Sequence, residues 1–258
     1  MKKIIIIGAA SGMGSELAKI FFARGYALGL ADINTTQLSI LARELGGNVK
    51  TKNIDVSSYA MARNQLEELI TELNGVDIFI YTAGLADKTR IWKNECMLHQ
   101  VNAVGFAALC SFVYDHWRAN NKKGHIVGVT SILAVRGIRQ AIAYCASKSF
   151  MKIYMQGLRQ DAASCRCGID ITEIRPGYID TPMTAGNCNV FWTITAENAA
   201  RLIFKAVMKK SKVAYVPGIW RLAALVLKML PEFLFKIRMS SVKNYFSRRI
   251  TPGYQGNI

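Results

Sequence analysis

The sequence has few of the residues that build metal sites and disulfide frameworks. Among its 258 residues are three histidines and six cysteines, and no two cysteines stand in a Cys-x-x-Cys pair. The histidines are scattered along the chain, so we predict no metal site. Cys165 and Cys167 are spaced too closely for a zinc knuckle, and reduced thiols in a cytoplasmic protein are the default interpretation.

Domain linkers and long apolar runs are also scarce. The chain has five prolines, and we find no internal repeat, low-complexity stretch or Pro/Ser-rich linker. The sequence therefore marks no boundary between two globular domains. The apolar run at residues 218–230 is shorter than the ~20 residues that span a bilayer, so we do not expect it to cross one.

Acidic residues are the minority charge. The chain has 17 Asp and Glu against 33 Lys and Arg, a formal net charge of +16. No nucleic-acid-binding motif accompanies this charge, so we expect no nucleic-acid partner. From residue 205 onward there are eleven basic residues and one acid, Glu232, so this segment carries +10.

The same basic segment contains apolar runs at 218–230 and 233–237, with Arg221 and Lys228 on a narrow polar stripe. Basic and apolar residues in this combination are typical of a segment that lies on an anionic membrane, here the inner face of the cell membrane. The alternative is a helix packed on the rest of the protein, as a lid over a pocket or as a contact in a homo-oligomer.

Short strand-like runs alternate with helical patterns along most of the chain. The runs lie at residues 2–7, 27–32, 49–53, 76–81, 125–130, 169–175 and 213–216. This order predicts the α/β class, a Rossmann-like doubly wound parallel sheet with helices on both faces. The length suits one such domain. We place it at residues 1–217, followed by a basic, apolar C-terminal extension at 218–258.

A glycine-rich turn follows the first strand-like run. Gly8, Gly12 and Gly14 precede a predicted helix at residues 15–24, and a strand, a glycine turn and a helix start form an anion site. The spacing differs from the dinucleotide-binding fingerprint, and an ordinary tight turn is the alternative. Asp32 ends the next run, about 20 residues on, where an acid that binds ribose is expected.

Tyr144 and Lys148 are spaced to share one face of a helix, one turn apart. The ordinary pKa of a phenol is ~10, and a neighbouring ammonium is expected to lower it toward neutral pH. A solvated helix face has the same pattern. Ser131, which follows the strand-like run at 125–130, and the glycine turn together favour the chemical interpretation.

In combination these motifs resemble the short-chain dehydrogenase/reductase family over roughly residues 1–217, and several stretches are similar to a bacterial subgroup of mostly unassigned substrate. The resemblance implies an oxidoreductase that transfers a hydride between a nicotinamide cofactor and a carbonyl or secondary alcohol. It assigns the catalytic roles to Asn102, Ser131, Tyr144 and Lys148. It assigns cofactor binding to Gly8, Ser11, Gly12, Met13, Gly14, Asp32, Asp55, Val56, Ala83, Gly84, Tyr144, Lys148, Pro176, Gly177, Ile179 and Thr181.

The sequence departs from the family pattern at two places. Ile7 stands where the family often has Thr, and Tyr81 and Thr82 replace two Asn that help to tie the central strands together. Asp32 should accept hydrogen bonds from ribose hydroxyls and repel a 2′-phosphate. NAD is therefore favoured as the cofactor, with NADP less favoured.

The sequence says less about the substrate. A specificity loop is expected after Thr181, and it contains the apolar residues Met183, Phe191 and Trp192. Arg136 and Arg139 either hold a substrate phosphate or are solvated. We predict a small-molecule carbonyl or alcohol that is lipid-like or lipid-linked. The alternatives to an enzyme are a dinucleotide-sensing regulatory protein and a membrane-recruited scaffold on the same fold.

Overall fold

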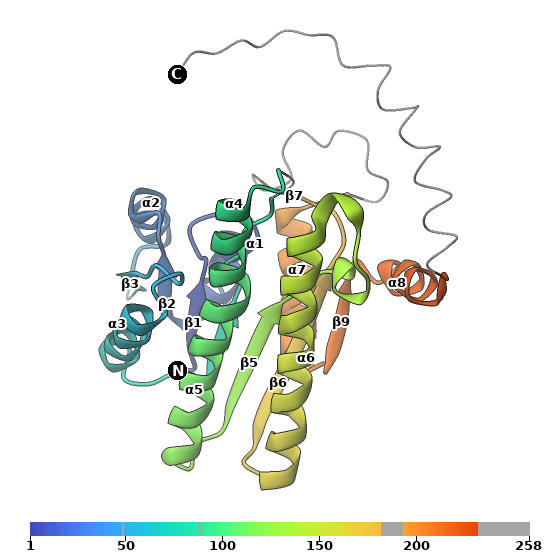
Figure 1. Ribbon diagram of the computed structural model, residues 1–258. Coiled ribbons are helices and arrows are strands. Elements are labelled where there is room, and N and C mark those ends of the chain that lie inside the picture. Colours follow the sequence, from blue (N-terminus) through green and yellow to red (C-terminus); the bar gives the residue numbers. More distant parts are fainter. Residues whose placement is uncertain (48, 88, 182–192, 232–258) are drawn as a thin grey trace, which may run out of the picture.

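A sheet of seven parallel strands forms the centre of the computed structural model, which describes residues 1–47, 49–87, 89–181 and 193–231 (Figure 1). The strand order is β3-β2-β1-β4-β5-β6-β9. All seven predicted strands are confirmed, with boundaries that shift by at most two residues. They are β1 (Lys3–Ile7), β2 (Ala27–Asp32), β3 (Val49–Asn53), β4 (Ile78–Tyr81), β5 (Gly124–Val129), β6 (Ile169–Pro176) and β9 (Val213–Val216).

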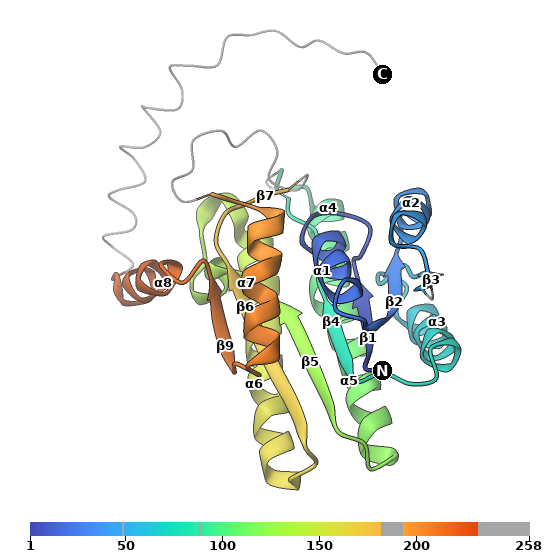
Figure 2. The same cartoon turned by 180° about the vertical axis from the view of Figure 1, so that it is seen from behind.

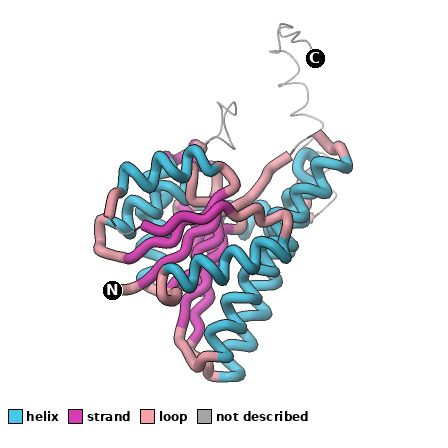
Figure 3. The backbone as a smooth tube through the Cα atoms, turned by 90° about the vertical axis from the view of Figure 1, so that its left-hand side faces the viewer, coloured by secondary structure: helices cyan, strands magenta, loops and turns pink. Residues whose placement is uncertain are grey.

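Helices cover both faces of this sheet. One face carries α1 (Gly12–Phe22), α2 (Thr35–Leu45) and α7 (Ala196–Met208), which lie toward the viewer in Figure 2. The opposite face carries α3 (Tyr59–Glu72), α5 (Phe106–Ala119) and α6 (Ile142–Cys165). Figure 3 shows the twisted sheet between the two helical layers. The predicted Rossmann-like fold is therefore confirmed.

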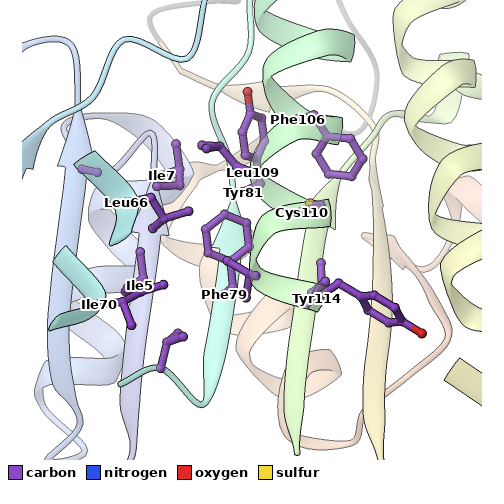
Figure 4. Close-up of a cluster of buried hydrophobic side chains, with 14 of the residues drawn as sticks. Ile5, Ile7, Leu66, Ile70, Phe79, Tyr81, Phe106, Leu109, Cys110 and Tyr114 are labelled. Carbon is purple, nitrogen blue, oxygen red and sulfur yellow. The ribbon is translucent and has the colours of Figure 1, made fainter. Parts of the chain in front are cut away.

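The isoleucine run of β1 explains why this strand lies at the centre. Ile4 and Ile6 belong to the core under α1 and α7, whereas Ile5 and Ile7 belong to the core under α3 and α5. Side chains alternate along a strand, and a strand buried on both faces needs apolar residues at every position. All four side chains are buried, and each contributes ~1.5–3 kcal/mol of burial. Figure 4 shows the second of these cores, with Ile5, Ile7 and Phe79 packed together.

The helix after the glycine turn begins earlier than predicted. It starts at Gly12, not at residue 15, so Gly12, Met13 and Gly14 form its first turn. Its N-cap, Ser11, makes no side-chain capping hydrogen bond in the described structure. The first N–H groups of α1 are therefore left without a cap at the end of β1.

Residues Trp92–Ala119 run from α4 (Trp92–His99) through the π-helix η1 (Gln100–Gly105) into α5. By length and composition this helical stretch could cross a membrane, with a mean hydropathy of 1.5. Its α5 part instead packs on the sheet, where Phe106, Leu109 and Trp117 are fully buried. The Trp117 indole also donates a hydrogen bond of 2.8 Å to the Val76 carbonyl. We therefore interpret the stretch as a core helix.

The C-terminal extension begins with α8 (Trp220–Met229), which ends two residues before Pro231. Trp220 and Ala224 are buried, and the helix packs on the short 3₁₀-helix η2 (Ile132–Val135). The Arg136 guanidinium donates hydrogen bonds to the Leu227 carbonyl, at 3.1 Å, and to the Leu230 carbonyl. Arg136 is therefore not the fully solvated side chain of one prediction, because its Nη1 caps α8, and its role as a phosphate ligand stays a prediction.

Because every strand of the main sheet is parallel, all their carboxyl ends meet at one edge. The loops after β1, β2, β4, β5 and β6 lie along this edge. A two-stranded parallel pair, β7 (Ile179–Asp180) and β8 (Ile194–Thr195), extends it after β6. Nearly all the predicted site residues follow these strands, so the fold collects them at one end of the molecule.

Candidate active site

The glycine turn leaves no room for side chains. Gly8 has φ +84°, and a β-carbon there would lie 2.5 Å from the Ala83 nitrogen. A β-carbon on Gly14 would lie 2.0 Å from the Gly8 carbonyl oxygen. Only glycine fits both positions. The turn can therefore hold the uncapped start of α1 directly beside the end of β4, in the arrangement that suits a phosphate group.

The Asp32 carboxylate lies beside this turn. Its Oδ2 accepts a 2.9 Å hydrogen bond from the Ala10 N–H, and its Oδ1 accepts one of 2.9 Å from the Asn34 N–H. The first bond fixes the end of β2 against the glycine turn. Two carboxylate oxygens have about four acceptor positions, so capacity remains for hydroxyl groups of a ligand.

Asp55 and Val56 follow β3 and support the site from its other side. The Asp55 Oδ1 accepts hydrogen bonds from Ser57 N–H (2.9 Å) and Ser57 Oγ (2.7 Å), which form a tight turn. Val56 is buried against η1, where a β-carbon on Gly105 would lie 2.3 Å from the Val56 carbonyl oxygen. Val56 therefore packs on the π-helix that carries Asn102.

Thr82 and Tyr81 replace the two asparagines of the family pattern with hydrogen bonds of their own. The Thr82 hydroxyl lies 2.8 Å from the Ile7 carbonyl and 2.9 Å from the Gly8 carbonyl, and it donates to both. The Tyr81 hydroxyl donates to the Val101 carbonyl at 2.7 Å. The departure from the family pattern thus keeps the ends of β1 and β4 joined.

Asn102 is fully buried in η1 and is held by three hydrogen bonds. Its Oδ1 accepts from the Leu85 N–H at 2.7 Å, and its Nδ2 donates to the Leu85 carbonyl at 2.8 Å. Nδ2 also donates to Ser147 Oγ at 3.1 Å, and Ser147 in turn donates to the Tyr144 carbonyl at 2.9 Å. A π-turn inserts an extra residue into a helix and redirects its side chains, which is common at functional sites.

Lys148 lies on the same face of α6 as Tyr144, one turn later, and its ammonium is 5.8 Å from the centre of the Tyr144 ring. Its Nζ donates to the Val129 carbonyl at 3.0 Å and to Met151 Sδ at 3.5 Å. Burial lowers the pKa of Lys148 to about 8, because the charged form loses its water. The solvated-face alternative is therefore wrong for Lys148.

Ser131 ends the loop from β5 and is buried beside Tyr144. Its Oγ accepts a hydrogen bond of 3.1 Å from the Leu133 N–H, which starts η2. Burial raises the pKa of Tyr144, and the hydrogen bond between Tyr144 and Ser131 lowers it. The prediction that Lys148 brings the Tyr144 pKa down is wrong for this structure, because burial outweighs the opposing contributions.

Gly84 lies between the glycine turn and the catalytic candidates. A β-carbon on Gly84 would lie 3.2 Å from Asn102 Oδ1 and 3.3 Å from Lys148 Nζ. These two side chains are therefore close neighbours across the Gly84 backbone. Ala83 and Gly84 follow β4 directly, so the structure brings the glycine turn, Asn102 and Lys148 into one cluster.

The segment after β6 closes the other side of the site. Pro176 ends β6, and Ile179 is buried in β7. A β-carbon on Gly12 would lie 3.2 Å from the Thr181 methyl group, so Thr181 faces the glycine turn. A β-carbon on Gly177 would lie 2.0 Å from the Trp220 indole nitrogen.

Two other predictions concern the substrate side. The predicted specificity residues Met183, Phe191 and Trp192 lie outside the described residues. Arg139 is exposed in the short 3₁₀-helix η3 (Arg139–Ala141).

Sequence reasoning missed the residues that hold the catalytic candidates. Ser147 joins Asn102 to α6, Met151 contacts the Lys148 ammonium, and Trp220 covers Gly177. Ser147 could have been found, because it lies between Tyr144 and Lys148. Nothing in the sequence pattern indicates that Trp220 contacts a residue 43 positions earlier, since only folding brings the two together.

Comparison with known proteins identifies the family. Residues 2–189 match the family model described as short chain dehydrogenase. The chain belongs to the short-chain dehydrogenase/reductase family. It is therefore a nicotinamide-dependent oxidoreductase that acts on CH–OH or C=O groups.

Curated relatives extend over most of this short-chain dehydrogenase. It is 30% identical over 241 residues to an uncharacterized oxidoreductase of Myxococcus xanthus, covering 90% of this chain and 93% of the relative. It is 28% identical to dehydrogenase/reductase SDR family member 7B of Danio rerio, covering 94% of this chain and 86% of the relative.

Solved structures share the fold at low sequence identity. A short-chain type dehydrogenase/reductase from Mycobacterium marinum aligns with a TM-score of 0.77 and 18% identity, over 85% of this chain and 95% of the other. A 3-ketoacyl-(acyl-carrier-protein) reductase from Brucella melitensis, solved with NADH, aligns with a TM-score of 0.75 and 20% identity, over 83% and 95%.

Proposed function

We propose that this short-chain dehydrogenase/reductase uses NAD(H) and acts on an apolar ketone or secondary alcohol, with Asn102, Ser131, Tyr144 and Lys148 as its catalytic residues. The observation that carries the proposal is the convergence of these four side chains at the carboxyl edge of the sheet, beside the glycine turn. Each of the four is wholly or largely buried and held by contacts from a different loop or helix.

The residues at the glycine turn fit a dinucleotide. The uncapped N–H groups of Gly12, Met13 and Gly14 would bind the pyrophosphate, and Asp32 would accept the adenosine ribose hydroxyls. Thr181, which faces Gly12, would hold the nicotinamide carboxamide. When bound, the cofactor supplies or accepts the hydride, and the protein supplies position and electrostatics.

Ser131 and Tyr144 would bind the substrate oxygen together, since the Ser131 hydroxyl lies close enough to the phenol to lower its pKa against the effect of burial. The raised pKa of Tyr144 keeps the phenol protonated at neutral pH, so it can donate a proton to a carbonyl that accepts the hydride. The Lys148 ammonium would supply a third donor to the nicotinamide ribose, beyond the two directed at Val129 and Met151. Asn102 would anchor the water that returns a proton toward Lys148.

Tyr144→Phe tests the acid/base role directly. The ring keeps its packing but has no proton to move, so kcat should fall by ~10²–10⁴-fold while NADH binding stays near normal. Tyr154→Phe is the matched control, because Tyr154 lies on the same helix and its hydroxyl donates a long 3.4 Å hydrogen bond to the Ala107 carbonyl, away from the catalytic candidates. An active Tyr144→Phe enzyme would refute the assignment. Intact NADH binding with no turnover in the wild type would indicate a sensor.

Cofactor choice rests on Asp32. A 2′-phosphate would meet this carboxylate, which is fixed by Ala10 and Asn34 and cannot turn away without breaking two hydrogen bonds. Asp32→Ala should narrow the preference for NADH over NADPH by about 1–3 kcal/mol. Titration of both cofactors into both proteins measures this difference. A wild-type enzyme that prefers NADPH would contradict the proposal.

The exposed face of α8 supports docking to an anionic membrane. Ile219, Leu222, Leu225, Val226 and Met229 recur at helical spacing and are each 48–74% exposed. Arg221 and Lys228 are exposed on the same helix. Apolar side chains entering the acyl boundary, with basic ones at the headgroups, are the pattern of an interfacial helix.

The inner face of α8 ties this surface to the active site. Trp220 packs on Gly177, and Arg136 holds the end of the helix to the loop that follows Ser131. A bilayer under α8 would therefore lie close to the substrate side of the site, which suits a lipid-like or lipid-linked substrate at the inner face of the membrane. Trp220 itself is buried, so it belongs to this anchor and not to the membrane-facing surface.

Liposome co-sedimentation tests the docking. The wild type should bind vesicles of anionic lipid, partly in a salt-sensitive way, and bind neutral vesicles much more weakly. The double variant Leu222→Ser, Leu225→Ser should lose the part of the vesicle binding that persists at high salt, because these apolar side chains would enter the bilayer. Both side chains are exposed, so the fold does not need them. If the wild type does not bind anionic vesicles at low salt, the proposed docking of α8 to a membrane is refuted. Loss of a dimer in the double variant would assign the face to a second copy of the chain.

A further inference from the structure

A cysteine pair lies at the far end of α6 from the active site. The helix ends at Cys165, its C-cap Arg166 is in the left-handed region with φ 50° and ψ 31°, and Cys167 follows. Lys148 is 17 residues earlier on the same helix, which corresponds to about 25 Å along its axis. The pair is therefore separate from the catalytic cluster.

The two sulfur atoms point to the same place. Cys165 Sγ lies 3.9 Å from the Tyr114 hydroxyl oxygen and 3.6 Å from the Ala162 carbonyl oxygen. Cys167 Sγ lies 3.8 Å from each of these two atoms. Two thiols that share both neighbours face each other, although nothing in a Cys-x-Cys sequence requires it.

The backbone spacing also suits a bond between them. The distance between the Cα atoms of residues i and i+2 depends on the dihedrals of the residue between them. For a helical residue it is about 5.4 Å, and a left-handed residue, the mirror image, gives the same value. Disulfides form when the Cα atoms are roughly 4.4–6.8 Å apart. Arg166 therefore holds Cys165 and Cys167 at a distance that a disulfide can bridge.

Solvent reaches this pair. Cys165 is exposed and Cys167 is partly exposed, whereas Cys110 and Cys145 are buried. The hydrogen bond from Cys167 lowers the pKa of Cys165, and the Arg118 guanidinium adds to this effect. The facing groups from α5 are Tyr114, whose hydroxyl is directed out of the apolar cluster in Figure 4, and Arg118.

We propose that Cys165 and Cys167 form a redox-active dithiol that exchanges with low-molecular-weight disulfides such as oxidised glutathione. The Cys165 thiolate attacks one sulfur of the reagent and expels the first glutathione thiolate, which leaves a mixed disulfide on Cys165. The Cys167 thiolate then attacks Cys165 Sγ and expels the second. Two electrons pass from the cysteine pair to the reagent, and the two cysteine protons end on the two released glutathione thiols.

The surrounding structure can accept this change. Disulfide formation removes two weak S–H donors from the Ala162 carbonyl, whose oxygen lies 3.6 Å from Cys165 Sγ and 3.8 Å from Cys167 Sγ. The Tyr114 hydroxyl keeps the hydrogen bond of 2.6 Å that it donates to Asp161 Oδ2. Asp161 is paired with Arg118 at 3.2 Å. This end of α6 therefore keeps its contact to α5 in both redox states.

Peptide mass spectrometry of the full chain tests the proposal. The background protein carries Cys188→Ser, which removes the one cysteine that lies outside the described residues. It is treated with oxidised glutathione, blocked with N-ethylmaleimide and digested with trypsin, which cuts after Arg166. The peptides that end at Arg166 and begin at Cys167 should remain linked until they are reduced. Cys167→Ser should stop at the glutathione adduct on Cys165, and Cys96→Ser should behave like the background protein.

Two results would overturn the dithiol. One is glutathione adducts or free thiols at both positions with no linked peptide. The other is a disulfide that joins the Cys165 peptide or the Cys167 peptide to a different cysteine of the chain. Phenylarsine oxide gives an independent measurement, because its trivalent arsenic bridges two neighbouring thiols. It should protect both cysteines from N-ethylmaleimide in the background protein and should leave Cys165 unprotected in Cys167→Ser. Equal labelling of the background protein with and without phenylarsine oxide would contradict the proposed pairing of the two thiols.

Discussion

The buried Lys148 ammonium should make the enzyme less stable than a variant that lacks it, by an amount that depends on pH. Burial lowers the pKa of this lysine from its ordinary 10.5 to about 8. The gap between these two pKa values corresponds to about 3 kcal/mol against the charged form in the folded state. The hydrogen bond from Lys148 to the Val129 carbonyl does not remove this cost, since the backbone oxygen carries only a partial charge.

The sign follows from proton binding. The folded pKa is below the unfolded one, so the unfolded chain holds the Lys148 proton more tightly at pH values between them. The full cost applies below about pH 8 and fades as the pH rises toward 10.5. Relative to Lys148→Met, the free energy of unfolding of the wild type should therefore rise by about 2 kcal/mol between pH 7 and pH 9.5.

Urea unfolding of both proteins at several pH values measures this difference. The Val129 carbonyl loses its partner in Lys148→Met, but that loss is the same at every pH and does not affect the trend. Lys205→Met is the control, because Lys205 is exposed on α7. The difference in unfolding free energy between the wild type and Lys205→Met should be the same at every pH. If the difference in unfolding free energy between the wild type and Lys148→Met is constant with pH, or changes in the opposite direction, burial is not the dominant effect on the Lys148 pKa.

Four further perturbations test the site and the fold that supports it. Gly14→Ala places a methyl carbon 2.0 Å from a carbonyl oxygen of the glycine turn, so the NADH dissociation constant should rise at least about tenfold in a fluorescence titration. Gly157→Ala on α6 meets nothing within 4 Å and should instead stabilise the protein by about 0.5–1 kcal/mol in urea unfolding. Trp220→Ala should free α8 from the segment after β6 and raise the KM for NADH, while Leu222→Ala, on the exposed face, should leave it unchanged. Burial lowers the pKa of His125 from 6.5 to about 4. As the pH falls from 7 to 4.5 the unfolded chain gains the proton first, so the wild type should lose about 2.5 kcal/mol of unfolding free energy relative to His125→Gln.

The positions of the strands along the chain could be predicted, and the candidate site residues could be proposed, because both depend on local patterns. A run such as that of β1, apolar at every position, is compatible with a strand buried on both faces. The pair Tyr144 and Lys148 lies one helical turn apart in any helix. The boundary of α1 was missed because glycines usually end helices, whereas here Gly12 and Gly14 begin one under the constraint of the Gly8 backbone.

What the sequence by itself determined is therefore the order of the elements, the edge at which the loops meet, and which side chains stand there. Only the tertiary structure decided the pKa values of these side chains and the contacts that hold them in place. The pKa of Tyr144 goes up and that of Lys148 goes down because burial, which no local pattern encodes, disfavours the charged form of each. Arg136 caps α8 because two segments separated by more than 90 residues pack together, and contacts at such separation exist only once the chain is folded.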